Sequence, residues 1–251
     1  MTTGRSSFRE AGDLPSCPSD AVPWITVAQM RDVDRAVIAI GLSLTRMMEN
    51  AGGALAGLAC AMLGGDVAQR QITVLAGRGG NGGGGLVAAR RLIGWGAHVD
   101  IRLASTPEEL APVPLEQLRL IERMSASLTV GADGLAPPEL FIDAILGYSQ
   151  KGDPLGLAAE LIAATRGASV LSLDVPSGLE LDNGTVGSPA VRAEATLTLA
   201  LPKAALRLPA ARPLVGELYL ADISIPAVVY EDVGIGYRSP FTCGPIVRLG
   251  I

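Results

Sequence analysis

Short apolar runs alternate with helix-like segments along most of the chain. The runs are QITVLAG (71–77), HVDIRLA (98–104), SLTVG (127–131), LFIDAILG (140–147), SVLSLDVPSG (169–178), ATLTLALP (195–202) and GELYLADISIP (216–226). Helices are predicted between them, from about Leu86 to Gly94, near 107–124 and near 155–166. Strands that alternate with helices indicate parallel strands joined by crossover helices. The pattern therefore predicts an α/β fold of three layers, Rossmann-like, with a mostly parallel central sheet.

Two further helices are expected ahead of the first strand, within residues 25–63 and separated at Gly41. Thr26 and Ser43 stand where N-cap residues are preferred. In the second helix the apolar residues follow a spacing of three and four, which gives one apolar face, made of Leu44, Met47, Met48, Ala51, Leu55, Leu58 and Met62. We expect both leading helices to pack on the sheet of one domain, residues 25–251, behind a flexible extension over residues 1–24.

Composition narrows the class of protein. Hydrophobic residues make up 49% and charged residues 18% of the 251 positions, as in a globular domain with a sizeable core. The net charge of −5 disfavours a nucleic-acid surface, which relies on basic patches. The longest apolar segment, 51–65, is too short and too polar at its start to span a membrane. Three widely spaced cysteines, without a CxxC pair or a visible secretory signal, favour a cytoplasmic protein.

Residues 76–92 read AGRGGNGGGGLVAARRL, with seven glycines among nine consecutive positions. Ordered glycine costs backbone entropy, so such a run marks an unusual turn or a backbone close to a ligand. The run follows a strand and opens a helix, where amide groups favour an anion such as phosphate. It is not a P-loop, and its match to GxGxxG is weak, with Asp100 as the only acidic partner for a ribose. A tight turn without a ligand is the alternative.

Four loops are expected at the carboxyl ends of the strands, where ligands bind in open parallel sheets. They are 77–85, 147–153, 174–178 and the stretch around Pro202 and Lys203. Asp143 and Asp174 lie at two of these strand ends, although a single such Asp is as often a loop cap.

The side chains near these ends suggest a cation site and acid–base chemistry. Together with Asn81 and Ser177, the two carboxylates would offer oxygen ligands to a hard cation. Lys151 and Asp153 could act as an acid–base pair, or Lys151 could simply be solvated. His98 is the single histidine, which excludes a histidine triad or a histidine metal site.

Taken together, several ordered motifs resemble the YjeF N-terminal domain, the NAD(P)H-hydrate epimerase family. They are AQMRDVDR (28–35), MMENAG (47–52), GRGGNGGGGLVAARRL (77–92), IDAILGYSQKGDP (142–154), DVPSGLELDNGTVGSPAVRAEATLTLALPKAAL (174–206) and GELYLADISIP (216–226). The likeness runs from about Ile25 to Pro226. It implies an isomerase that interconverts the epimers of hydrated NADH or NADPH, and a homodimer formed through the leading helices.

The resemblance also implies roles for individual residues. A potassium ion would be held by Asn81, Asp143 and Ser177. Asp174 would bind the substrate and carry out the acid–base work with help from Lys151. The substrate would further contact Gly80, Asn81, Gly82, Gly83 and Gly84, and the loop Gly147, Tyr148, Ser149, Gln150, Lys151, Gly152 and Asp153.

The glycine loop departs from the family pattern at two positions. The family loop usually reads GNNGGDG, whereas this chain has GGNGGGG, so Gly80 replaces an Asn and Gly84 replaces an Asp. The alternative is therefore a diverged domain without epimerase activity, either a binding or scaffold module or an isomerase or cyclase on another small molecule. A nicotinamide-dependent oxidoreductase has no support, because no catalytic Tyr-Lys or His pair follows.

Overall fold

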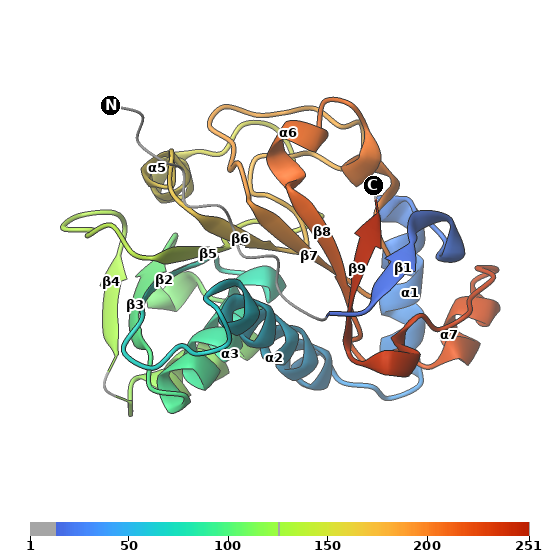
Figure 1. Cartoon of the computed structure of the whole chain (residues 1–251), viewed down its shortest axis with the longest axis horizontal. Helices are drawn as coiled ribbons and strands as arrows, with labels where there is room; N and C mark the ends of the chain where they lie inside the picture. The colour runs from blue at the N-terminus through green and yellow to red at the C-terminus, as the bar shows by residue number, and fades with distance from the viewer. Residues whose placement is uncertain (1–13, 125, 251) are drawn as a thin grey trace.

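The computed structural model describes residues 14–124 and 126–250, and within these ranges nine strands form one sheet (Figure 1). Its strand order is β1-β9-β8-β7-β6-β5-β2-β3-β4, and every neighbouring pair is parallel except β8 with β9. The bounds are β1 Ser16–Pro18, β2 Gln71–Ala76, β3 His98–Leu103, β4 Ser127–Val130, β5 Leu140–Ala144, β6 Val170–Leu173, β7 Ala195–Leu199, β8 Glu217–Ala221 and β9 Ile246–Gly250. The predicted mostly parallel sheet is confirmed.

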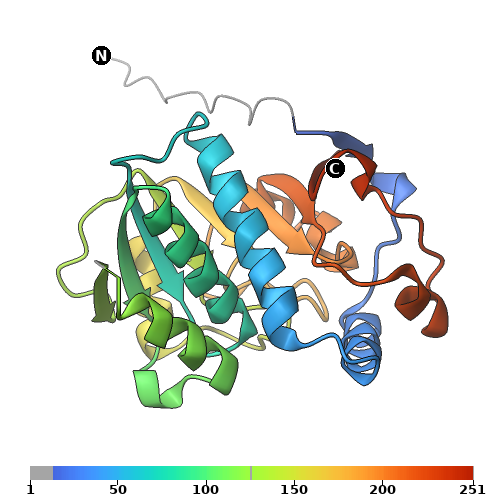
Figure 2. The same ribbon diagram turned by 90° about the horizontal axis from the view of Figure 1, so that it is seen from below.

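Helices cover both faces of this sheet, which gives the predicted three layers (Figures 1 and 2). On one face lie α2 (Leu44–Met62), α3 (Gly80–Gly94) and α4 (Pro112–Ile121), and on the other α5 (Gly156–Ala164) and α6 (Arg212–Val215). Near β8 and β9, α1 (Val27–Ala39) contacts α7 (Ala227–Asp232). Short 3-10 turns span Ser19–Ala21, Pro107–Glu109, Ala204–Arg207 and Phe241–Cys243. None of the helices within the described ranges has the length and apolar character needed to cross a membrane.

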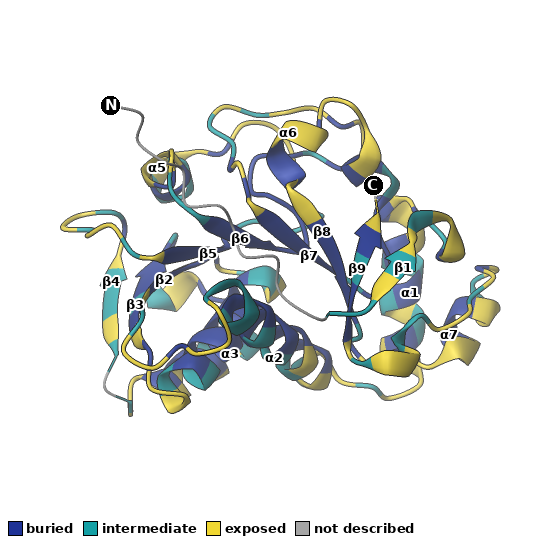
Figure 3. Ribbon diagram, viewed as in Figure 1, coloured by how far each residue is buried: buried dark blue, intermediate teal, exposed yellow. Residues whose placement is uncertain are grey.

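Burial follows the same layering, with dark strands at the centre and exposed outer faces on the helices (Figure 3). The largest apolar cluster lies between the sheet and helices α2 and α3, with Leu55, Leu86 and Ile101 fully buried in it. A second cluster packs α5 on the opposite face through Leu161 and Ile162. The near-continuous apolar strands of the sequence are thus buried from both sides.

The two leading helices form where the capping residues predict them. The Thr26 hydroxyl accepts a hydrogen bond from the amide of Gln29, whose side chain accepts one from the Thr26 amide, a capping box. Ser43 caps the second helix by accepting from the Arg46 amide. Gly41 adopts φ +89° between them, a conformation that glycine allows without strain.

Strand order reverses between β2 and β5. The chain runs outward from β2 to β3 and β4, then crosses to β5 and continues in the other direction through β6, β7 and β8. In open parallel sheets a crevice opens at the carboxyl ends of the strands at such a switch point. The fold therefore places the ends of β2 and β5, residues 77–81 and 145–147, at the predicted ligand site.

Three predictions of local structure are corrected. Helix α3 begins at Gly80 rather than near Leu86, so most of the glycine run is its first turns and not a loop. The helix expected near 107–124 is a 3-10 turn followed by the shorter α4. Of the expected flexible extension, residues 14–24 belong to the fold, because β1 pairs with β9 and Val22 is buried, while 1–13 lie outside the described residues.

Close backbone packing explains why so many glycines stand in α3. A Cβ on Gly77 would lie 1.8 Å from the carbonyl oxygen of Ile145, and one on Gly82 would lie 1.7 Å from that of Gly77. A Cβ on Gly83 would lie 2.4 Å from the sulfur of Met48 in α2. These glycines let the strand end, the helix start and α2 approach more closely than any larger residue would allow.

Candidate functional site

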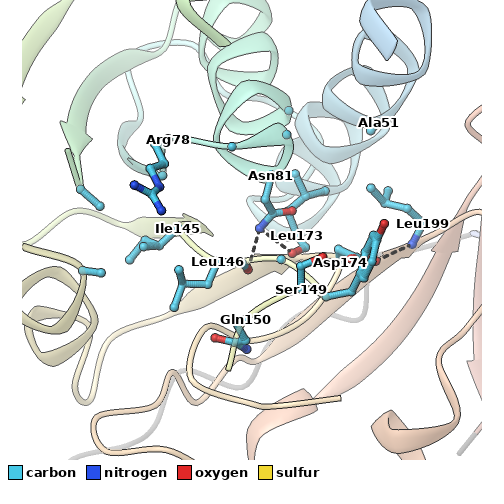
Figure 4. A pocket seen from close by; sticks show the side chains of 18 of the residues that line it. Ala51, Arg78, Asn81, Ile145, Leu146, Ser149, Gln150, Leu173, Asp174 and Leu199 are labelled. Atoms are coloured by element: carbon cyan, nitrogen blue, oxygen red, sulfur yellow. Dashed lines mark hydrogen bonds between the residues drawn. The ribbon is translucent and has the colours of Figure 1, made fainter. Parts of the chain in front are cut away.

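A cavity of about 780 Å³ lies along the carboxyl ends of β2, β5, β6 and β7 (Figure 4), within the size range of small-molecule sites. Helices α1 and α2 contribute apolar side chains to it, among them Met30 and Met47. Most of the predicted substrate contacts line it, namely Gly80, Asn81, Gly84, Gly147, Tyr148, Ser149, Gln150, Lys151, Gly152, Asp153 and Asp174. Gly82, Gly83, Asp143 and Ser177 do not line it.

The most buried charges at this cavity belong to Asp174 and Lys203. Lys203 Nζ lies 2.5 Å from Asp174 Oδ1. The Lys203 side chain is 2% exposed and the Asp174 side chain 5%. The carboxylate oxygen also accepts weaker hydrogen bonds from the Leu199 amide (3.4 Å) and the Thr198 hydroxyl (3.5 Å). Asp174 has φ +65°, a left-handed conformation that Asp tolerates better than most residues. Such strain in a cavity wall is typical of functional sites.

The backbone at Lys203 is tied to the chain that leads into α1. Ile25 pairs with Lys203 in an isolated parallel bridge, in which the Ile25 amide donates to the Pro202 carbonyl (3.0 Å) and the Ala204 amide donates to the Ile25 carbonyl (2.8 Å). The lysine is therefore fixed from both sides, by its ion pair and by this bridge.

A second carboxylate, Asp34 of α1, faces the same end of the cavity. It accepts a hydrogen bond from the hydroxyl of Tyr148, on the loop after β5. Burial raises the pKa of Asp34 and the negative charge of Asp174 adds to this, while the Tyr148 hydrogen bond and the charge of Lys203 lower it. Burial, with the nearby Asp34, also raises the pKa of Tyr148. One end of the cavity thus gathers two carboxylates, an ammonium group and a phenol.

Asn81, in the first turn of α3, joins the ends of β5 and β6, next to the switch point (Figure 4). Its side-chain amide donates to the carbonyl oxygens of Leu146 (2.9 Å) and Leu173 (3.1 Å). These carbonyls follow β5 and end β6, so both oxygens converge on one point at the rim of the sheet.

Asp143 lies behind this point and is fully buried. Its carboxylate accepts four hydrogen bonds, from the Ser172 hydroxyl (2.8 Å), the Ser177 amide (2.9 Å), the Ser177 hydroxyl (2.6 Å) and the Ile145 amide (3.3 Å). Ser177 in turn accepts from the Leu146 amide (2.9 Å). Burial raises the pKa of Asp143, and these hydrogen bonds oppose the shift. Because a carboxylate has about four acceptor directions, Asp143 is saturated and holds the loops after β5 and β6 together.

The structure separates other pairs that the sequence suggested. Lys151 forms an ion pair with Asp182 (3.3 Å) and is 67% exposed, while Asp153 accepts from the Ser188 amide. Among the described residues Lys151 forms no ion pair with Asp153 or Asp174, and Lys203 is the lysine that pairs with Asp174. Lys203 was recognisable only as a lysine in one of the four strand-end loops.

The structure also bears on the suggested ribose partner and on metal binding. Asp100, the suggested ribose partner, lies within β3, where its carboxylate accepts from Arg102 (2.8 Å), and it does not line the cavity. In the part of the chain that the structure describes, no group of three or more His, Cys, Asp or Glu side chains could hold a metal ion.

Comparisons with known proteins agree with this architecture. A relative from Dehalogenimonas lykanthroporepellens, named NAD(P)H-hydrate epimerase, is 43% identical over 237 residues, which cover 91% of this chain and 94% of that protein. A relative from Salinibacter ruber, named bifunctional NAD(P)H-hydrate repair enzyme Nnr, is 35% identical over 86% of this chain, which spans 42% of that longer protein. The crystal structure of yeast ynu0, YNL200c, shares the fold, with a TM-score of 0.73 and 23% identity over 91% of this chain and 100% of that one.

The family described as "YjeF-related protein N-terminus" matches residues 44–205, from the start of α2 to the loop that carries Lys203. This range includes the glycine-rich start of α3, Asp143, Asp174 and Ser177. The chain therefore belongs to the YjeF-related N-terminal family.

Proposed function

We propose that this protein is an NAD(P)H-hydrate epimerase, which interconverts the R and S epimers of hydrated NADH or NADPH. The observation that carries the proposal is the buried Asp174–Lys203 pair on the wall of a cavity at the strand switch point. It is supported by 43% identity to a relative named for that activity.

The chemistry needs an acid, a base and a polar pocket. In the hydrate, the ring nitrogen expels the C6 hydroxyl as water when an acid donates a proton, which leaves a planar iminium ion. Water then adds to either face and gives its proton back to the base. Asp174 suits this exchange, because Lys203 and the other donors bind Oδ1, whereas Oδ2 has no hydrogen-bond partner among the described residues. Asp34, with its raised pKa, is the second proton carrier in the same cavity end.

Lys203 supports this exchange electrostatically. Its ammonium group lies 2.5 Å from Asp174 Oδ1 and is held away from solvent, so it compensates the buried charge and fixes that oxygen. Lys151, expected as the helper, lies at the exposed rim instead, where we propose a substrate contact and no proton transfer.

Potassium fits the oxygen atoms at the switch point, and we propose Asn81 and the carbonyls of Leu146 and Leu173 as its direct ligands. Both carbonyl oxygens converge on the position now taken by the Asn81 amide hydrogens, so a cation there requires the amide oxygen to face them. Asp143 is already saturated by hydrogen bonds and, through Ser177, holds the backbone of Leu146 in place. A bound cation would order the loops and offset substrate charge.

The test uses a single epimer of hydrated NADH, incubated with the purified protein with and without potassium, and chromatographic separation of the two epimers. We expect interconversion well above the spontaneous rate, and its loss in Asp174→Asn. Interconversion at the spontaneous rate in the wild-type protein would remove the proposal.

A diverged, non-epimerising domain is the second candidate, and the geometry at Gly84 favours it. A Cβ on Gly84 would lie 2.7 Å from Cδ2 of the buried Leu173, so the family Asp would require this methyl group to move. At Gly80, by contrast, no atom lies within 4 Å of a Cβ, and the family Asn would fit. If the wild type is inactive and Gly84→Asp with Leu173→Val epimerises the hydrate, this second candidate is correct.

The oligomeric state of the protein and its location in the cell are also part of the proposal. We propose a homodimer through the leading helices, which sedimentation equilibrium would test. The exposed apolar side chains Ile38, Ile40 and Leu44 support this choice of surface. The free Cys17, Cys60 and Cys243 are consistent with a cytoplasmic location, which cell fractionation would test.

A further inference from the structure

The cavity extends beyond the acid–base end, past β2 to the end of β3. Here it is lined by Arg78, Ala104, Ser105 and Glu109, and by Leu155 and Ala158 at the start of α5. None of these residues was expected to contact the substrate.

Arg78 carries the uncompensated positive charge of the cavity wall. Of the three basic residues that line the cavity, Lys203 is paired with Asp174 and Lys151 with Asp182. The Arg78 side chain has no hydrogen bond or ion pair with any described residue, and it points from the end of β2 towards Ile145 (Figure 4). Glu109, the nearby acid, accepts the Thr106 amide (2.9 Å) and forms no ion pair with the arginine.

Two more groups at this end lack partners. Gly79 is the N-cap of α3 and has no side chain to bind the free amides of the first turn, at Gly80 and Asn81. Such amides, with the helix dipole, favour an anion. The hydroxyl of Ser105 is also without a hydrogen-bond partner in the described part of the chain, although the residue is only 6% exposed. An arginine, open helix amides and an unpaired buried hydroxyl together suit a phosphate group.

Strand order sets the distance from this end to the acid–base end. Neighbouring strands lie about 4.8 Å apart, so β2, which leads to Arg78, is roughly 10 Å from β6, which leads to Asp174. In a dinucleotide, the pyrophosphate is separated from the nicotinamide ring by one ribose. A ring placed at Asp174 would therefore put the pyrophosphate near Arg78 and the adenosine over β3 and α5.

From these observations we infer that Arg78 binds the pyrophosphate of the substrate, while the adenosine half lies over Ala104, Ala158 and the exposed side chain of Leu155. Leu155 is 80% exposed at the mouth of the cavity, an apolar surface that a base could cover. The inference rests on the proposed function for the identity of the dinucleotide. It adds the direction in which the dinucleotide lies and the residue that anchors it.

Binding of ADP-ribose, which lacks the reacting ring, tests the anchor without any turnover. We expect Arg78→Gln to weaken ADP-ribose binding by about 10- to 100-fold in isothermal titration calorimetry, because a charge-assisted hydrogen bond to phosphate is lost. Arg119→Gln is the matched control, since Arg119 is exposed on α4 and does not line the cavity. Equal binding by the two variants would overturn the inference, provided that both unfold at the wild-type temperature.

Kinetics with two substrates separates this inference from the proposed function. Arg78→Gln should raise KM for hydrated NADH with little change in kcat, and should leave the epimerisation of hydrated reduced nicotinamide riboside, which has no phosphate, unchanged. An equal effect on both substrates would contradict the anchor. A protein that binds ADP-ribose through Arg78 but epimerises neither hydrate would contradict the proposed function alone.

Discussion

The ammonium group of Lys203 and the carboxylate of Asp174 meet at 2.5 Å across two loops that follow adjacent strands, β7 and β6. Both side chains are almost fully buried, so each compensates a charge that the interior would otherwise not tolerate. We therefore expect the pair to contribute both to the stability of the fold and to the proposed reaction.

Replacing Lys203 by Met should leave the Asp174 carboxylate buried and unpaired. We expect Lys203→Met to lower the unfolding free energy by about 3–5 kcal/mol, measured by urea denaturation, and to abolish epimerisation. Lys151→Met is the control, because that lysine is exposed and its change should stay within about 0.5 kcal/mol. A small loss at Lys203, similar to that at Lys151, would show that the buried pair contributes little.

Two glycines of α3 should respond in opposite ways to the same substitution. Gly82→Ala would place a Cβ 1.7 Å from the Gly77 carbonyl oxygen, and we expect it to prevent folding or to lower the melting temperature strongly. Gly80→Ala has open space around its Cβ, and it should be neutral or stabilising by up to about 1 kcal/mol. Similar melting temperatures for the two variants, measured by circular dichroism, would show that the close contact of Gly77 and Gly82 is not required.

Tyr148→Phe should isolate the role of the phenol on Asp34. Without the donated hydrogen bond, the pKa of Asp34 should rise further, because that bond favours the charged carboxylate. NMR titration of the Asp34 carboxyl carbon would measure the shift. We also expect a loss of about 1–3 kcal/mol in unfolding free energy. An unchanged or lowered pKa would mean that Tyr148 does not hold the carboxylate.

Asp34, whose pKa is raised in the folded protein, should make the protein less stable as the pH rises. Burial raises the pKa of Asp34 above its ordinary 3.8, so the folded protein keeps a proton that the unfolded chain releases. The contribution of this group to stability is therefore complete below about pH 3.8 and is lost as the pH rises through the raised pKa. Burial also raises the pKa of Asp143, so this carboxyl contributes to the pH dependence in the same direction in the wild type and in an Asp34 variant.

Asp34→Asn removes this contribution. As the pH rises from about 4 towards 7, the wild type should lose this contribution, so the unfolding free energy of the variant should increase relative to that of the wild type. Urea denaturation at each pH would measure both values. A difference that stays constant, or that moves the other way, would contradict the raised pKa of Asp34.

The central strands were predictable from the sequence because each is an apolar run long enough to be buried on both faces. The two strands at the β1 end of the sheet were not: β1 has three residues, including Pro18, and β9 follows a region without periodic signal. The start of α3 was misplaced because glycine disfavours helices in isolation, and only the contacts of Gly82 and Gly83 show why it is needed there.

The sequence predicted the residues that family motifs specify, but it did not predict which side chains pair with one another in the folded protein. Asp174, Asn81 and the loop 147–153 lie at the cavity as the motifs imply. The partner of Asp174 could not be read from the sequence, because Lys203 is 29 residues away and reaches it only through the pairing of β6 with β7. Asp143 is expected as a cation ligand from its place at a strand end, whereas the four hydrogen bonds to its carboxylate are visible only in three dimensions.

The bridge between Ile25 and Lys203 ties the segment that leads into α1 to the wall of the cavity. Two backbone hydrogen bonds connect Ile25 with Pro202 and Ala204, the neighbours of the lysine. A substitution that shifts the backbone at Ile25 should therefore also shift Lys203, although Ile25 itself does not line the cavity.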